Sequence, residues 1–215
     1  LCTSLYAVVD GWFIVNFTDE ISYAAVNVMS PYIIIFPTVG FMLGTGGSAL
    51  ISMVLGQGDQ KRARQIFSMI LQLGLALSAI MTALEFLLMD PFVTWQKANE
   101  ALRAGCMAYG KVILIGTTFS IFQYAFQSFL VMADKQRMAF AVTILAGMTN
   151  MVFDALFIIV FRWGLAGAAA ASVMGEAVGA ILPALHFFRG KVDQLKYVRT
   201  KMEAKILIKV CGNGS

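Results

Sequence analysis

Two acidic residues, Asp10 and Asp154, lie inside otherwise apolar stretches of this 215-residue chain. Asp10 closes the segment YAVVD at residues 6–10, and Asp154 lies within NMVFDALF at residues 150–157. An ionised carboxylate in the hydrocarbon of a bilayer costs at least about 2.5–3.5 kcal/mol, so intramembrane acids usually face a cavity and bind something. If the chain crosses a membrane, the two carboxylates predict a site for a cation or a proton.

The composition indicates that the chain is embedded in a lipid bilayer. Hydrophobic residues make up 59% of it and charged residues 13%, whereas a soluble domain carries about 25% charged residues. The apolar runs also approach the roughly 20 residues that span hydrocarbon. A water-soluble enzyme is therefore excluded. The net charge of +4 does not indicate nucleic-acid binding, because the basic residues bracket the apolar runs.

The apolar runs predict an all-α membrane protein, a bundle of six transmembrane helices. The predicted spans are residues 1–17, 24–55, 66–89, 109–132, 138–160 and 165–188. No period-two alternation recurs, as barrel strands would need. The second run is too long for one straight span, and its segment GTGGS at residues 44–48 predicts a break. Small residues such as Gly40, Gly44 and Gly47 predict seams of close helix packing.

The two ends of the chain predict a fragment of a longer protein. We expect a six-helix transmembrane lobe at residues 1–188, with a truncated first helix, and a basic linker between lobes at residues 189–205. Residues 206–215 then begin a seventh helix, which is truncated.

Lysine and arginine are distributed unevenly between the two sides of the predicted bundle. Twelve of the 16 fall on one side, within residues 61–64, 135–137 and 189–209. The positive-inside rule places this side in the cytoplasm. We therefore expect a multi-pass protein of the cell (plasma or inner) membrane, with the tail after Phe188 cytoplasmic.

Polar side chains from three predicted helices reach similar depths in this topology. Asp10, Asp154 and Ser172 lie roughly 10 Å below the outer surface, at 1.5 Å per helical residue. Asn150 and Glu176 lie one turn deeper on the same helix faces. Their oxygen atoms suit a small hard cation, whereas desolvated carboxylates can carry protons instead. Ser172 taken alone is better explained by a hydrogen bond between helices.

Two other polar features lie in the middle of the chain. Ser120, Gln123 and Gln127 form one stripe at helical spacing, which could line a substrate cavity or form a hydrogen-bonded seam between helices. Glu85 lies near the outer end of the third predicted span, so we expect its carboxylate to snorkel to the membrane surface.

The order of these features resembles the amino-terminal lobe of multidrug and toxic compound extrusion (MATE) transporters over essentially the whole chain. The matching pieces are LYAVVD at 5–10, GGSALIS at 46–52, LGQGD at 55–59, NMVFD at 150–154 and GLAGAA at 164–169. The resemblance implies a two-lobed, twelve-helix antiporter. Such a protein exports drugs or other small organic compounds, often cationic, in exchange for sodium or protons.

The resemblance also implies functional residues and partners. The family's cation site maps onto Asp10, Asn150 and Asp154, which would be a sodium site in a sodium-coupled member. Ser172 lies where the family often has threonine, and Glu176 where it often has glutamine, a difference that bears on the choice of ion. The implied partners are the bilayer, a small-molecule substrate and the missing second lobe. No catalytic residue and no cofactor beyond the coupling ion is expected.

Three other functions remain as alternatives. A flippase of lipid-linked sugars belongs to the same superfamily, but its cavity usually holds several basic residues, and the predicted spans contain almost none. An intramembrane aspartyl protease also needs two membrane Asp residues, but it carries Gly-x-Gly-Asp, whereas Asp154 follows MVF. A membrane scaffold without transport would have no reason to bury two carboxylates at one depth.

Overall fold

The described part of the chain is helical throughout its membrane region. The computed structural model describes residues 11–189, 195–200, 203, 206, 210, 212 and 214. Within them, five helical segments are long and apolar enough to cross a membrane. The first predicted span lies mostly outside the described residues, and its last part, residues 11–17, is helical. The predicted all-α membrane fold is thus confirmed.

The second predicted span is a helix with one break. Helix α2 (Glu20–Ile35) and helix α3 (Thr38–Gly56) are separated at Phe36 and Pro37. The break predicted at residues 44–48 is therefore wrong. Proline lacks a backbone donor and clashes with the preceding turn, which explains the position of the break. The glycines further along remain helical and instead allow close packing of α3 on α5.

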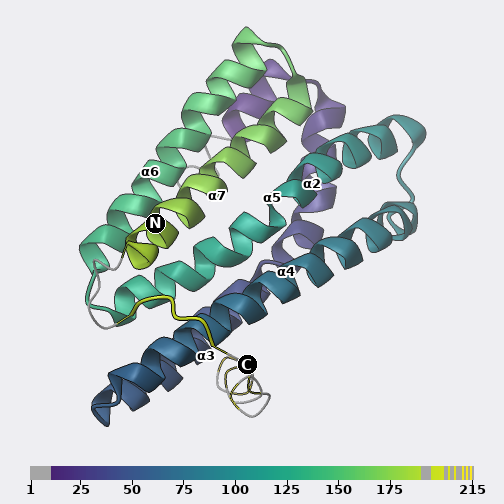
Figure 1. Ribbon diagram of the computed structural model, residues 1–215. Coiled ribbons are helices and arrows are strands. Elements are labelled where there is room, and N and C mark those ends of the chain that lie inside the picture. The colour runs from purple at the N-terminus through teal and green to yellow at the C-terminus, as the bar shows by residue number, and fades with distance from the viewer. Residues whose placement is uncertain are drawn as a thin grey trace.

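The remaining elements are four long helices and one short π-helix. They are α4 (Gln60–Trp95), α5 (Glu100–Met132), α6 (Gln136–Asp154), the π-helix η1 (Ala155–Val160) and α7 (Gly164–Phe188). Helix α5 is central and packs against α2, α3, α4 and α7, while α6 packs mainly against α7 (Figure 1). Side chains on different faces of α5 therefore meet different neighbouring helices.

Three helices begin where a side chain caps the first turn. Asp19 accepts a hydrogen bond from the Ser22 amide at 3.1 Å. The Ser22 hydroxyl, together with this amide, lowers the pKa of the Asp19 carboxyl. Asp59 caps α4 in the same way, and Asn99 caps α5. Asp and Asn are preferred at this position because they satisfy amides that have no partner within the helix. These caps define the turns between spans.

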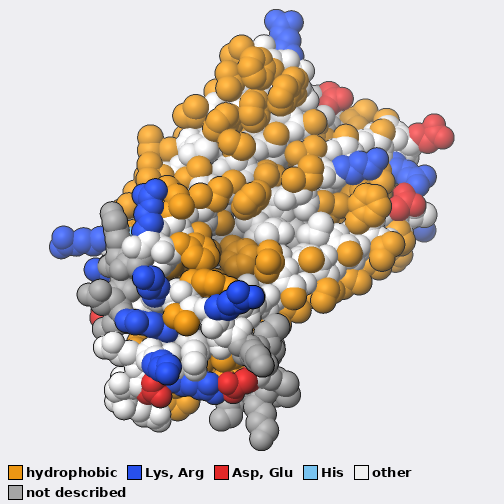
Figure 2. All heavy atoms as spheres, in the orientation of Figure 1, with side chains coloured by type: hydrophobic (Ala, Val, Ile, Leu, Met, Phe, Trp, Pro, Cys, Tyr) orange, Lys and Arg blue, Asp and Glu red, His pale blue; other side chains and the backbone are white. Residues whose placement is uncertain are grey.

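Basic residues gather at one end of the bundle. The turns at 57–59 and 133–135 and the end of α7 lie at this end, and the turns at 96–99 and 161–163 lie at the other (Figure 1). Figure 2 shows Lys and Arg side chains concentrated at the lower end of the visible face. The charge asymmetry expected from the sequence is therefore a feature of the folded bundle.

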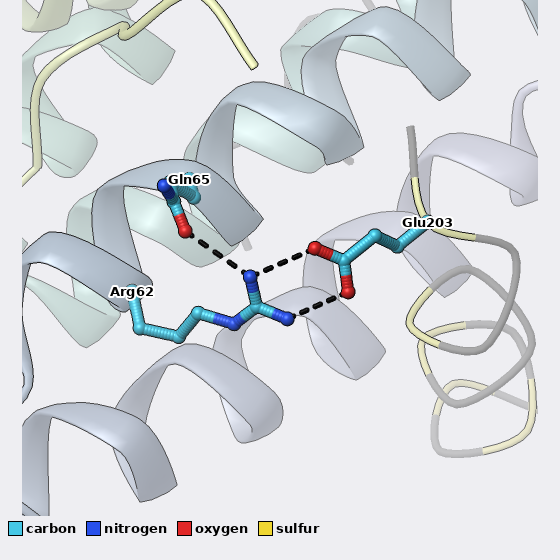
Figure 3. A network of polar contacts seen from close by, with 3 residues as sticks. All are labelled: Arg62, Gln65 and Glu203. Carbon is cyan, nitrogen blue, oxygen red and sulfur yellow. Dashed lines mark hydrogen bonds and ion pairs between the residues drawn. The ribbon is translucent and has the colours of Figure 1, made fainter. Parts of the chain in front are cut away.

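The tail segment, defined here as residues 195–200, lies along α4. The Leu195 side chain is completely buried, and the Val198 amide donates a hydrogen bond to Ser68 Oγ at 2.7 Å. Further along, both Glu203 carboxylate oxygens accept hydrogen bonds from Arg62, at 2.9 and 2.7 Å (Figure 3). This ion pair lowers the pKa of Glu203. Much of the predicted linker at 189–205 and most of the seventh-helix start at 206–215 lie outside the described residues.

Candidate functional site

A polar cavity of about 280 Å³ lies among α2, α5, α6 and α7. Apolar side chains from α2 and α5 form one wall. The polar lining comes from two tyrosines and four of the residues singled out by the sequence: Tyr109, Tyr124, Gln123, Asn150, Ser172 and Glu176. Polar residues of α5, α6 and α7 are thus brought to one cavity. The sequence placed Asn150, Ser172 and Glu176 at similar depths together with Asp10, which lies outside the described residues.

Asn150 joins α6 to α7 at the cavity wall. Its side chain is 5% exposed, and Nδ2 donates a hydrogen bond to Ser172 Oγ at 3.4 Å. Its Oδ1 atom has no hydrogen-bond donor within the described part of the chain. Gly175 permits this contact, because a Cβ there would lie 2.9 Å from the Ala146 carbonyl oxygen. The close helix approach leaves an amide oxygen available to a ligand.

The Glu176 carboxyl group occupies space that a glycine leaves open. A Cβ on Gly116 of α5 would lie only 3.0 Å from Glu176 Oε2. That oxygen is buried and accepts no hydrogen bond from the described residues. Ser120 lies beside the same carboxyl group, and its hydroxyl donates to the Gly116 carbonyl at 3.3 Å. An acid in such a place can bind a cation or carry a proton.

Asp154 is buried near the cavity lining but is not part of it. Its side chain is completely buried, and it is not among the residues that line the cavity. It ends α6, and the π-helix η1 begins at the next residue. Short π segments occur frequently at functional sites, because the altered backbone register redirects side chains. Asp10, its predicted partner, lies outside the described residues, so their pairing stays a prediction.

The predicted polar stripe of α5 divides between two roles. Gln123 lines the cavity, and Gly179 of α7 makes room for it, since a Cβ there would lie 2.6 Å from Gln123 Cδ. Gln127 instead donates a hydrogen bond to Thr143 Oγ1 of α6 at 2.9 Å. Gln127 therefore belongs to a hydrogen-bonded seam between α5 and α6, whereas Gln123 lines a cavity and its contact with substrate stays a prediction.

Glu85 does not reach the membrane surface, so the snorkelling prediction is wrong. It is 3% exposed, and the Thr117 hydroxyl donates to its carboxylate. The Tyr32 hydroxyl donates to its backbone carbonyl. Helix α4 continues to Trp95, which leaves Glu85 roughly 15 Å from that helix end. The apolar run around Glu85 could have identified it as a buried acid, as the run around Asp154 did for that residue.

The contact between Glu85 and Thr117 predicts a measurable coupling between α4 and α5. In a double-mutant cycle with Glu85→Ala and Thr117→Val, we expect a coupling energy of about 1 kcal/mol in thermal unfolding of the purified protein. Glu85→Gln, which keeps an acceptor oxygen, should lose less stability than Glu85→Ala. Strictly additive effects would show that the hydroxyl does not stabilise the carboxyl group.

Within the described residues, no three His, Cys, Asp or Glu side chains cluster as a metal site. The predicted sodium ligands consist of Asp10, Asn150 and Asp154, and the first of them lies outside those residues. Oxygen donors of this kind are the ligands that a hard cation prefers. The chemistry of Asn150 and Asp154 therefore fits such an ion, and the complete set stays a prediction.

An apolar helical bundle that holds carboxyl groups beside a polar cavity is typical of membrane transport proteins. The MatE family model matches residues 1–156, and the chain belongs to this family of transporters, not enzymes. The resemblance inferred from the sequence motifs is confirmed.

Curated relatives are multidrug export proteins. The chain is 25% identical over 98% of its length to multidrug export protein MepA of Staphylococcus saprophyticus, covering 47% of that protein. It is 23% identical over 88% of its length to MepA of Staphylococcus aureus strain NCTC 8325, covering 42%. The chain thus spans about half the length of the curated relatives it matches.

Solved structures share the fold. A crystal structure of MATE in complex with MaD3S matches with a TM-score of 0.92 at 22% identity, over 99% of this chain and 48% of that one. An inward-facing multidrug resistance MATE transporter matches with a TM-score of 0.91 at 22% identity, over 98% of this chain and 48% of that one. The predicted six-helix bundle therefore corresponds to half of a MATE structure.

Proposed function

We propose that this chain is the amino-terminal lobe of a two-lobed antiporter that exports small organic compounds, often cationic, in exchange for sodium or protons. The observation that carries the proposal is the cavity into which Asn150 and Glu176 bring oxygen atoms that accept no hydrogen bond from the described residues. The export function of the MepA relatives supports the substrate class.

In this proposal Asp10, Asn150, Asp154, Ser172 and Glu176 hold the coupling ion. Asn150 links the cavity to Asp154, which lies one helical turn away on the same face. An entering ion would contact the Asn150 and Glu176 oxygens, which accept no hydrogen bond from the described residues. This contact would stabilise the ion-bound state relative to the ion-free state.

Gln123 is the proposed contact for substrate, with Ser120 nearby and Gln127 outside the cavity. The described residues that line the cavity include no Lys or Arg. A pyrophosphate-linked sugar would need such cations, because burying its charge without partners is costly. The lining therefore favours export of neutral or cationic compounds over the flippase alternative.

The proposal is tested by purifying the complete transporter and reconstituting it in liposomes with a fluorescent organic cation. A sodium gradient and a pH gradient are imposed separately, and we expect one of them to drive accumulation. Collapse of that gradient by an ionophore should stop transport, and protein-free liposomes provide the control. Transport that ignores both gradients would contradict an antiporter.

The proposed orientation places the tail after Phe188 in the cytoplasm. A membrane-impermeant thiol reagent added to intact cells should label Glu100→Cys and miss Lys196→Cys, in a background without native cysteines. Both positions are exposed, and they lie at opposite ends of the bundle. Permeabilised cells should label both variants. The reverse pattern in intact cells would invert the topology.

A further inference from the structure

An apolar groove of about 390 Å³ lies on the outside of the bundle between α4, α5 and α7, on a different side of α7 from Asn150. Its lining includes Leu75 of α4, Phe122 of α5 and Ile181 of α7. The Leu75 and Ile181 side chains are 61% and 46% exposed. Figure 2 shows hydrophobic side chains around a hollow beside the lower end of α7. The groove is therefore open on the outside of the described bundle.

The tail segment closes this groove at the basic end of the bundle. The Tyr197 ring lines the groove and lies 5.6 Å from the Phe188 ring, measured between centroids. Gln72 Nε2 donates a hydrogen bond to the Tyr197 hydroxyl at 3.4 Å. The hydrogen bond from the Val198 amide to Ser68 Oγ fixes the neighbouring backbone. The groove thus has an apolar body and one polar end.

Three basic residues lie close in sequence to the residues at this polar end. Lys196 directly precedes Tyr197, Arg199 follows it by two residues, and Arg189 directly follows Phe188. All three are exposed, and none belongs to an ion pair within the described part of the chain. Glu203, the described acid nearest to them in sequence, is paired with Arg62. No described acid therefore neutralises these three charges, and they can attract an external anion.

We propose that the groove binds an anionic phospholipid, with an acyl chain along Phe122 and Leu75 and its phosphate held by Lys196, Arg199 and Arg189. In a bilayer, apolar surface alone selects no particular lipid, because the tails are as apolar as the groove. Selection must come from the headgroup, and basic residues at the membrane surface attract anionic lipids. This inference is independent of the exported compound and of the coupling ion.

The test measures lipid retained by the complete transporter after purification in detergent with equal phosphatidylglycerol and phosphatidylcholine. We expect native mass spectrometry to show at least about a tenfold preference for phosphatidylglycerol. The variant Lys196→Gln/Arg199→Gln/Arg189→Gln should lose this preference. The control variant Lys97→Gln/Lys111→Gln, changed at the opposite end of the bundle, should keep it.

Two further measurements test the apolar groove independently of the basic residues and distinguish binding of a lipid from binding of free phosphate. Leu75→Trp fills the groove from an exposed position, so it should reduce phosphatidylglycerol retention severalfold without lowering the thermal midpoint of delipidated protein. Phosphatidylglycerol should raise that midpoint, whereas inorganic phosphate at equal concentration should not. Unchanged lipid preference in the triple variant, unchanged retention in Leu75→Trp, or equal stabilisation by phosphate would each overturn the proposal.

Discussion

Replacing Asp154 with asparagine should reduce ion-driven export by the complete transporter to the background of protein-free liposomes. The substitution preserves the shape of the side chain and one acceptor oxygen, but it removes the charge that a cation or proton would neutralise. Asp154 is completely buried at the end of α6, so an exposed acid cannot replace its carboxylate at that position. The measurement is substrate flux under the driving gradient, normalised to the amount of reconstituted protein.

The matched control is Asp134→Asn. This aspartate is exposed in the turn before α6 and has φ 56°, a conformation that asparagine also tolerates. We expect wild-type flux from it. Asp154→Glu, which restores the charge with a longer side chain, should recover part of the flux. Wild-type flux from Asp154→Asn would remove Asp154 from the proposed coupling site.

Gly40→Ala should strongly destabilise the bundle. A Cβ at position 40 would lie 2.2 Å from the Ile121 carbonyl oxygen of α5, which is a backbone atom. No rotamer change can relieve this clash, so α3 and α5 would have to separate. Overpacking of this kind costs about 3 kcal/mol. We expect a thermal midpoint well below that of the wild type, measured on purified protein in detergent.

Gly56→Ala is the control for the same chemical change in the same helix. It ends α3, and a Cβ there would meet nothing within 4 Å. Its midpoint should match the wild type or rise slightly, because alanine reduces the freedom of the unfolded chain. Equal midpoints for the two variants would show that α3 and α5 are further apart than described.

The sequence predicts the helices well because apolar runs of membrane length leave few alternatives. The sequence-based prediction fails where tertiary contacts determine the position of a helix break or the burial of a side chain. The segment from Gly44 to Ser48 was assigned to a break, but it is helical. The packing seam that the sequence predicts at Gly44 is present, since a Cβ there would lie 2.7 Å from Ser128 Oγ. Glu85 was placed near a helix end because the apolar run stops at Met89, whereas α4 continues to Trp95.

The site shows the same division. Asn150 and Glu176 could be predicted because spacing along one helix determines which residues share a face. The different roles of Gln123 and Gln127 could not, because each depends on the neighbour that α5 meets at that level. Gln123 meets Gly179 of α7, and Gln127 meets Thr143 of α6. Such contacts follow from helix arrangement rather than from any local pattern.

Helix α4 links two distant contacts of the bundle. It carries the Arg62 ion pair to the tail near its beginning and the buried Glu85 roughly 35 Å further along, with no break between them. The same uninterrupted helix therefore connects the tail contact at Glu203 with the contact between Glu85 and Thr117.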